Sequence, residues 1–512
     1  MKIYKLPLRA LGAAPARALR SSRACETGEC PVMPASSQSC GRPGGRSSAS
    51  TLAAVLTMFT AAATYGDPLY QRPAGVAEAD ESLIVAGYRA LFTCSAYFFA
   101  GRQLADIEQV ELADTRSAGF PKPVVDVARQ LVIASDEAGN EQIAAYRDTM
   151  GCTLLPPHWG LGDVPRLPYV AYAKTPDVAD LEFPEGDRVD LGRNGLHREF
   201  RGLEELLDRS FDGSTYGEGV VTASVIIVRD GEIVAERYRP GFGVTSGYRT
   251  WSTAKSITAA LMGIAARKGL LELDAPAAIP EWQFPGDPRR NITYEQLLWM
   301  SSGLYSGGNN TYAVYFGGQD VLSAVTTTNL EVEPGSRWKY ANNDTMLLLW
   351  ALRHVLGDDL RYLRFPYDEL LHRIGMYHTR METDHLGNFV GSSQVYTTAR
   401  DLARFGLLLA GDGVWNGERI LPQGWVAFSR TPAPTRPAEE GSQGYGAQFW
   451  LLGTLPGIPE GTFTTAGNKG QYVTIVPDYD LVIVRTGVDP LGIRWLHDRF
   501  VADVIANLHP GD

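Results

Sequence analysis

The residues best suited to chemistry are a serine and a lysine three positions apart, Ser252 and Lys255, at the start of an apolar run over 257–271. If this segment is helical, positions i and i+3 lie on one face, so both side chains reach the same space. A hydroxyl needs a neighbouring base to become a nucleophile, and a desolvated lysine can supply one. The pair is therefore a candidate for nucleophilic catalysis. The alternative is a capping serine beside a solvated lysine.

Two later segments follow this pair in order. Tyr340 and Asn342 stand two residues apart in the stretch 333–344, and Asn468, Lys469 and Gly470 precede a β-rich run near the C-terminus. The order of these motifs resembles the serine β-lactamase and penicillin-binding-protein superfamily. The chain looks closest to its class C-like serine hydrolases, which include 6-aminohexanoate-dimer hydrolases and related esterases. The connecting segments that share the resemblance are 269–274, 292–304, 397–406 and 444–450, and the resemblance as a whole covers about residues 190–508.

The resemblance implies a role for each motif residue. Ser252 would attack a carbonyl carbon, and Lys255 would accept or relay its proton. Tyr340 would be a second proton shuttle towards the leaving group, although a phenol normally titrates near 10 and would need nearby cations or donors to act as a base. Asn342 would orient Lys255 and bind a substrate amide. Backbone N–H groups of Ser252 and Gln471 would hold the oxyanion.

The third motif departs from the lactamase pattern. Asn468 stands where a lysine or histidine is usual, and Lys469 where a threonine or serine is usual, whereas Gly470 followed by Gln471 matches the dimer-hydrolase-like branch. This departure weakens the case for efficient β-lactam hydrolysis, and Lys469 is either near the cleft or solvated. Tyr312 belongs to an aromatic loop over 305–318 that either clamps substrate or packs on the surface.

The elements that must position these residues are readable from the sequence. β-Rich runs at 220–228 and 233–238 flank an Asp-Gly turn, and two more at 471–476 and 481–484 follow near the end. Helical patterns cover 196–211 and 494–508. Strands at both ends with helices between them predict one sheet built from both ends of the domain, with a helical region inserted. The resemblance implies an α/β (α+β) fold of the β-lactamase/transpeptidase type, with an antiparallel sheet flanked by helices. A hairpin is expected within 131–146.

Composition suggests a preceding arm. The 512 residues carry a net charge of −11, which does not favour a nucleic-acid partner. Residues 1–63 are basic and rich in Ser, Gly, Pro and Ala, and 51–63 resemble the apolar core and cleavage site of a signal peptide. This indicates export to the periplasm or secretion; the alternative is a disordered or organelle-targeting arm. The domains predicted are a 1–63 signal or targeting arm, a 64–190 flanking segment and a 191–512 hydrolase domain.

Only two of the five cysteines, Cys94 and Cys152, lie in the body of the chain, and they are either paired or free. No cofactor or metal is expected, because the sequence has no H-E-x-x-H and no phosphate loop. We predict a serine hydrolase that acts on a small-molecule amide, ester or oligomer, with no stable membrane span in the mature form. The alternative is a catalytically weak protein that binds a cell-wall peptide or penicillin.

Overall fold

The computed structural model describes residues 81–113, 119–172, 176–189, 191, 202–306, 308–437, 439–490 and 492–508. The arm predicted for 1–63, with its signal-like segment at 51–63, lies outside the described residues.

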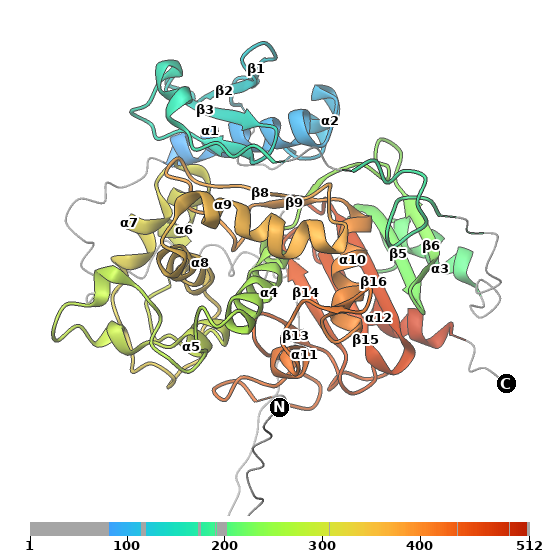
Figure 1. Ribbon diagram of the computed structural model, residues 1–512. Coiled ribbons are helices and arrows are strands. Elements are labelled where there is room, and N and C mark those ends of the chain that lie inside the picture. Colours follow the sequence, from blue (N-terminus) through green and yellow to red (C-terminus); the bar gives the residue numbers. More distant parts are fainter. Residues whose placement is uncertain are drawn as a thin grey trace, which may run out of the picture. The chain divides into compact units, whose positions relative to one another are not determined.

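Seven strands form the central antiparallel sheet, in the order β12-β13-β14-β15-β16-β5-β6 (Figure 1). Their bounds are β5 Thr222–Arg229, β6 Glu232–Tyr238, β12 Gly444–Tyr445, β13 Trp450–Leu451, β14 Phe463–Gly467, β15 Gln471–Val476 and β16 Leu481–Gly487. The first strand of the domain pairs with the last, with Ile227 opposite Ile483. The predicted sheet, built from both ends of the domain, is confirmed.

The hairpin between β5 and β6 follows from its turn residues. Asp230 and Gly231 both have positive φ, 51° and 84°, as a two-residue turn that matches strand twist requires. β5 itself is rich in β-branched residues and is buried along nearly its whole length. A strand buried on both faces requires helices on each side of the sheet.

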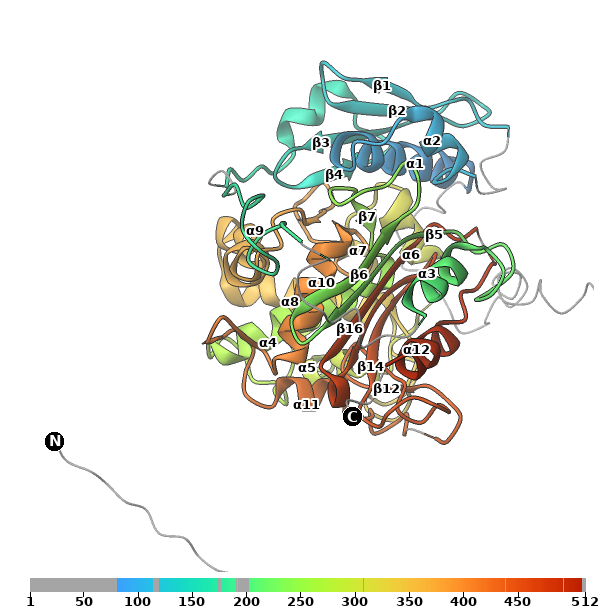
Figure 2. The same ribbon diagram turned by 90° about the vertical axis from the view of Figure 1, so that its right-hand side faces the viewer.

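Helices cover both faces of this sheet (Figure 2). On one face, α10 (Ala399–Ala410) packs so closely that a Cβ at Gly406 would lie 2.4 Å from a methyl carbon of Val482. On the other face, α3 (Leu203–Phe211) and α12 (His497–Ala506) share an apolar cluster with β5 and β16. The two predicted helices at the ends of the domain are thus present. Helix α12 is shorter than the pattern over 494–508, and the 196–201 part of the other prediction lies outside the described residues.

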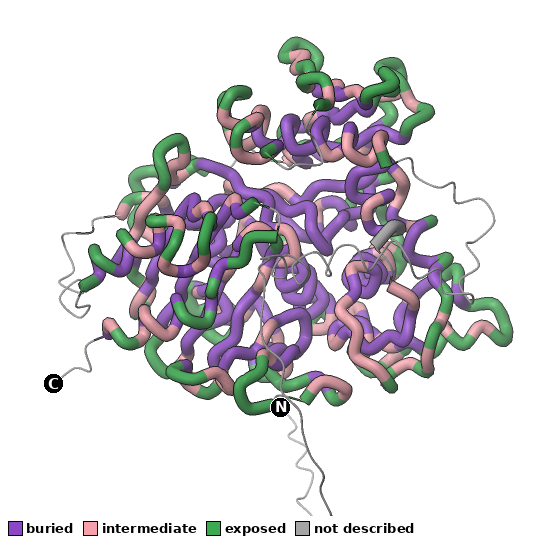
Figure 3. Tube along the Cα trace, turned by 180° about the vertical axis from the view of Figure 1, so that it is seen from behind, coloured by how far each residue is buried: buried purple, intermediate pink, exposed green. Residues whose placement is uncertain are grey.

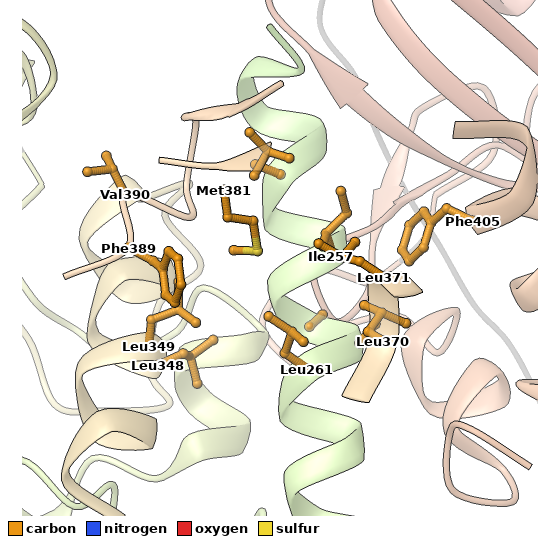
Figure 4. Close-up of a cluster of buried hydrophobic side chains, with 14 of the residues drawn as sticks. Ile257, Leu261, Leu348, Leu349, Leu370, Leu371, Met381, Phe389, Val390 and Phe405 are labelled. Atoms are coloured by element: carbon orange, nitrogen blue, oxygen red, sulfur yellow. The ribbon is translucent and has the colours of Figure 1, made fainter. Parts of the chain in front are cut away.

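The inserted helical region lies between β7 and β9, two strands of a small sheet ordered β7-β9-β8. The bounds are β7 Tyr248–Arg249, α4 Ala254–Arg267, α5 Tyr294–Leu298, α6 Gly308–Phe316, α7 Val321–Thr326, α8 Asn342–Leu356, α9 Asp359–Pro366, β8 Arg380–Met381 and β9 Val395–Thr397. Helix α4 is buried from Ala254 through Ala265. Figure 4 shows its Ile257 and Leu261 among side chains of α8 and of the segment after α9. In Figure 3 the buried stretches of the chain, coloured purple, run through the interior of the protein.

The flanking segment forms a layer of its own elements. Helix α1 (Glu81–Cys94) continues into a π-helical turn (Ser95–Phe99), followed by α2 (Leu104–Gln109). A sheet ordered β1-β2-β3-β4 comprises Val124–Asp126, Leu131–Ser135, Glu141–Arg147 and Gly151–Leu154, which confirms the predicted hairpin. The helix over Glu81–Phe99 is long and apolar enough to cross a membrane, but 56% of its apolar window is buried inside the protein, a pattern also typical of a core helix.

A disulfide links two elements of the flanking layer. The buried acid Glu382 connects this layer to the segment after β8. Cys94 and Cys152 form a disulfide between the end of α1 and β4, so the paired alternative holds. Glu382, which follows β8 and is 1% exposed, accepts hydrogen bonds from Ser95 Oγ at 2.7 Å and from the backbone N–H of Cys152 at 2.9 Å. Burial raises the pKa of Glu382 to about 7.

Candidate active site

Ser252 occupies a tight turn between a strand and a helix. The 3-10 turn Trp251–Thr253 follows β7 and leads directly into α4. Trp251, the residue before the serine, has a φ of 49°, a left-handed conformation that an aromatic residue adopts only at a cost of about 1–3 kcal/mol. Ser252 is half-buried, so its hydroxyl is accessible while the backbone on either side is fixed.

Lys255 has three hydrogen-bond acceptors around its amine. Its Nζ donates to Ser252 Oγ at 3.1 Å, to Asn342 Oδ1 at 2.6 Å and to the backbone carbonyl of Ser392 at 2.9 Å. All three acceptors are uncharged, and the side chain is only 1% exposed. Burial without a carboxylate therefore lowers the pKa of Lys255 to about 7. The amine of Lys255 is therefore partly deprotonated at neutral pH.

Tyr340 lies in the loop before α8, with its ring beside the amine of Lys255. Burial raises its pKa to about 12, although a hydrogen bond between its side chain and that of Ser252 acts in the other direction. The amine of Lys255 lies 5.0 Å from the centre of its ring. Tyr340 therefore stays a neutral phenol over the physiological range. On sequence grounds nearby cations are needed if Tyr340 is to act as a base, and no cation lowers its pKa in the described structure.

Aromatic packing fixes the orientation of Tyr340. Its ring is stacked on Trp450 with centroids 5.8 Å apart and meets Tyr445 edge to face at 5.9 Å. These partners come from β12 and β13 at the end of the central sheet. Asn342, the first residue of α8, is placed by the same loop. The sheet and α8 thus jointly hold the groups that face Ser252.

The turn of Ser252 also contacts the edge of β14 and β15. Thr253 Oγ1 lies 3.0 Å from Thr465 Oγ1 and 3.2 Å from the backbone carbonyl of Gln471. A Cβ at Gly467 would lie 2.1 Å from the carbonyl oxygen of Thr250, so only glycine lets β14 approach this closely. The backbone of Gln471 therefore lies beside the serine turn, on the side where the resemblance places the oxyanion donors.

The third motif forms the turn between β14 and β15. Asn468 is exposed, and its Oδ1 accepts a hydrogen bond from the backbone N–H of Lys469 at 2.9 Å. Gly470 has a φ of 85°, and a Cβ there would lie 1.5 Å from Nη1 of Arg485. The glycine of this motif is thus explained by packing over the buried ion pair of Arg485 and Asp489, 2.7 Å apart.

Lys469 and Tyr312 lie at the margins of the site. Lys469 lines a cavity of about 40 Å³ together with Trp251, Gln471 and residues of the flanking layer. Tyr312 is half-buried on α6 and stacks with Phe316 at 6.3 Å, and Phe316 in turn meets Trp251 at 6.5 Å. The structure thus brings together Ser252, Lys255, Tyr340 and Asn342. Tyr312 is separated from Trp251, the neighbour of Ser252, by the ring of Phe316.

Sequence reasoning missed Ser392, whereas Tyr315 belongs to the predicted aromatic loop over 305–318, most of which is helix α6 in the structure. Ser392 acts through its backbone carbonyl, which any residue could supply, so no sequence signal marks it. Its hydroxyl lies 2.5 Å from the hydroxyl of Tyr315, a buried residue of α6. In the part of the chain that the structure describes, no group of three or more His, Cys, Asp or Glu side chains could hold a metal ion.

Comparison with known proteins identifies the family of the chain. Residues 206–486, more than half of the chain, match the family model described as Beta-lactamase. The chain belongs to the Beta-lactamase family and is a hydrolase of that family. This confirms the superfamily and the fold predicted from the motifs.

Individual proteins are also similar to the chain. The 6-aminohexanoate-dimer hydrolase of Paenarthrobacter ureafaciens is 27% identical over 320 residues, which is 57% of this chain and 80% of that protein. A D-stereospecific amidohydrolase from Streptomyces sp. is 15% identical with a TM-score of 0.47, covering 59% of this chain and 98% of its own. A class C beta-lactamase in complex with cefoxitin is 15% identical with a TM-score of 0.44, covering 59% and 96%.

Proposed function

We propose that the chain is a serine hydrolase that cleaves an amide or ester bond through an acyl-enzyme on Ser252. One observation carries the proposal: the amine of Lys255 donates a hydrogen bond to Ser252 Oγ at 3.1 Å, and the side chain of Tyr340 is close enough to that of Ser252 to affect its own pKa. The two flanking groups differ by about five units in pKa, since burial brings Lys255 to about 7 and Tyr340 to about 12. Such a separation assigns the base to one group and the acid to the other.

In acylation, neutral Lys255 takes the proton of Ser252 while Oγ forms a bond to the substrate carbonyl carbon. The carbonyl oxygen becomes an oxyanion, for which the backbone N–H groups of Ser252 and Gln471 are the proposed donors. Tyr340, still a phenol, gives a proton to the leaving amine or alcohol and is reprotonated from Lys255. The bond to the leaving group then breaks, and the acyl group stays on Ser252.

In deacylation, a water molecule repeats the sequence in the other direction. Neutral Lys255 accepts its proton, the water oxygen bonds to the acyl carbon, and the bond to Ser252 Oγ breaks as Oγ takes a proton back from Lys255. Asn342 keeps the amine of Lys255 oriented and can donate its amide N–H to a substrate carbonyl. No other group needs to change its charge during the cycle.

For the substrate we propose a small linear amide or ester, with Asn468, Lys469, Gly470 and Tyr312 at its binding site. The exposed Asn468 is engaged with the turn backbone and carries no charge for a substrate carboxylate. This supports an amidase or esterase more than an efficient β-lactamase. The relationship to a 6-aminohexanoate-dimer hydrolase, at 27% identity, supports the same class.

A fluorophosphonate probe tests the nucleophile. We expect one adduct on Ser252 by peptide mass spectrometry, and none in Ser252→Ala with an unchanged melting temperature. A panel of p-nitrophenyl esters, aminohexanoate dimer and nitrocefin would then rank the substrates. If Ser252→Ala hydrolysed the esters at the wild-type rate, or the wild type took up no probe, the hydrolase proposal would fail and a peptide-binding role would replace it.

We further propose that the protein is exported to the periplasm or secreted. The disulfide between Cys94 and Cys152 supports this, because such bonds persist in oxidising compartments. N-terminal sequencing of the mature protein is the test. A start shortly after residue 63 is expected, and an intact Met1 would contradict export through the predicted signal.

A further inference from the structure

Arg249 is a buried cation that the proposed chemistry does not use. It ends β7, three residues before Ser252, and is 5% exposed. Within the described part of the chain it has no ion pair; its Nη2 donates to Ser393 Oγ at 3.0 Å, and its Nε and Nη1 have no hydrogen-bond partner. A buried charge in this state needs another source of stabilisation.

Aromatic rings contribute to that stabilisation, beside the electrostatic interaction with Glu382. The guanidinium carbon lies 4.5 Å from the ring centre of Trp251, 4.8 Å from that of Phe92 and 5.2 Å from that of Phe316. Cations over aromatic faces at such distances are attracted by the ring quadrupole, and more strongly when water is excluded. Phe92 belongs to α1 in the flanking layer, outside the family match at 206–486. The aromatic box around Arg249 is therefore completed by a segment outside the family match.

Two contacts of Arg249, with Trp251 and with Ser393, connect it to Ser252 and to Lys255. Trp251 holds the left-handed backbone immediately before Ser252. Ser393 follows Ser392, whose carbonyl accepts the hydrogen bond from Lys255 Nζ. A single planar side chain thus contacts both the turn that presents the nucleophile and the segment that holds its base.

We infer that Arg249 is a positioning residue for Ser252 and Lys255, held in place by Phe92 of the flanking layer. The inference rests on the proposed function. By stacking on Trp251 and bonding to Ser393, Arg249 keeps the serine turn and the Ser392 carbonyl at a fixed separation. Small displacements of reacting groups lower catalytic rates strongly, by about 100-fold for about 1 Å. Its effect should therefore appear in kcat more than in KM.

The titratable groups that face Arg249 are Tyr315, Tyr396 and Glu382. None of them contacts Lys255 through a hydrogen bond in the described structure, and the pKa of Lys255 is lowered by burial alone. A loosened Ser392 segment would admit water to the amine and let its pKa rise. The acid side of the pH profile thus reports on the position of Lys255.

The test compares Arg249→Met and Arg249→Lys with Arg102→Met. Arg102 is the control, because it is also 5% exposed and lies over an aromatic ring, that of Phe242 at 3.7 Å; unlike Arg249 it has an ion-pair partner, Glu111 at 3.4 Å. For Arg249→Met we expect kcat to fall about 100-fold with KM within about threefold. The midpoint of the acid limb of kcat should rise by about one pH unit or more. Arg249→Lys, which keeps the charge but not the planar face, should fall in between.

A purely structural role predicts a different result. Arg249→Met would then melt earlier but show wild-type kcat per probe-labelled site and an unmoved acid limb, as expected for Arg102→Met, and the inference would be overturned. Should Arg249→Met fail to fold, Phe92→Leu and Arg249→Lys carry the same readouts. If Ser252→Ala remains active, the proposed function fails instead, so the two failures are distinguishable.

Discussion

The amine of Lys255 lies 3.1 Å from the hydroxyl oxygen of Ser252, inside an interior where only 1% of the lysine is exposed. Three uncharged acceptors surround that amine, so it gains hydrogen bonds but no counter-charge. The consequence is an amine whose protonation changes near neutrality.

Activity should therefore rise with pH through about 7. Burial lowers the pKa of Lys255 to about 7, so the amine is protonated and inactive below that pH and neutral above it. We expect kcat/KM for a neutral ester to increase about tenfold per pH unit below the midpoint and to be flat above it. A profile with its acid limb near 10 would show that Lys255 is solvated. Melting temperatures at each pH control for unfolding.

Asn342→Asp should move that limb upwards. The substituted carboxylate would lie where Asn342 Oδ1 now accepts the lysine hydrogen bond at 2.6 Å. A negative charge at that distance favours protonated Lys255 and raises its pKa, so activity should be restored only at more alkaline pH. Asn342→Leu removes the acceptor without adding charge and serves as the control. Identical acid limbs in both variants would contradict this reading of the lysine environment.

Tyr340→Phe should separate proton transfer from packing. The substitution removes the hydroxyl but keeps the ring that is stacked on Trp450. We expect kcat to fall by about 10²–10⁴-fold, with a small change in melting temperature, since a positioned acid or base contributes that much. Tyr445→Phe, in the same aromatic cluster, is the control and should retain activity. Wild-type turnover by Tyr340→Phe would remove Tyr340 from the mechanism.

Loss of the disulfide should destabilise the protein. Cys94 and Cys152 are 58 residues apart in sequence, and closing a loop of that length restricts the unfolded chain by about 4 kcal/mol. The double variant Cys94→Ser/Cys152→Ser should show this loss of unfolding free energy in urea. Dithiothreitol should lower the stability of the wild type towards that of the variant and leave the variant unchanged. Equal stability of the two proteins would mean that the bond does not form.

His497 should make stability depend on acid pH. Burial lowers its pKa to about 3, while its ring stacks on Tyr472 with centroids 3.8 Å apart. Because the unfolded imidazole titrates near 6.5, His497 is neutral in both the folded and the unfolded state above that pH, and the free energy of unfolding is not reduced. As the pH falls from about 6.5 towards 3, the free energy of unfolding decreases by up to about 1.4 kcal/mol per unit. His497→Phe should remove that part of the slope between pH 6 and 4. An unchanged slope would locate the acid sensitivity elsewhere.

Much of the site could be predicted because its residues act through side chains in ordered motifs. The spacing of Ser252 and Lys255 indicates a shared helical face, and the Asp230-Gly231 turn indicates the hairpin that starts the sheet. Other parts leave no such mark. Ser392 contributes a backbone oxygen, and the contacts of Arg249 with Phe92 and Ser393 arise only when segments about 150 residues apart in sequence are brought together. The pairing of Cys94 and Cys152 likewise depended on tertiary proximity.

The position of Glu382 has a practical consequence for truncation. Its carboxylate takes its hydrogen bonds from Ser95 and Cys152 of the flanking layer, and it is 1% exposed. A shortened chain starting at the edge of the family match would leave this acid without its donors and would uncover the apolar surface beneath α1. The smallest fragment that can be expressed as a stable unit should therefore begin upstream of Glu81, well before the first residue that sequence comparison recognises.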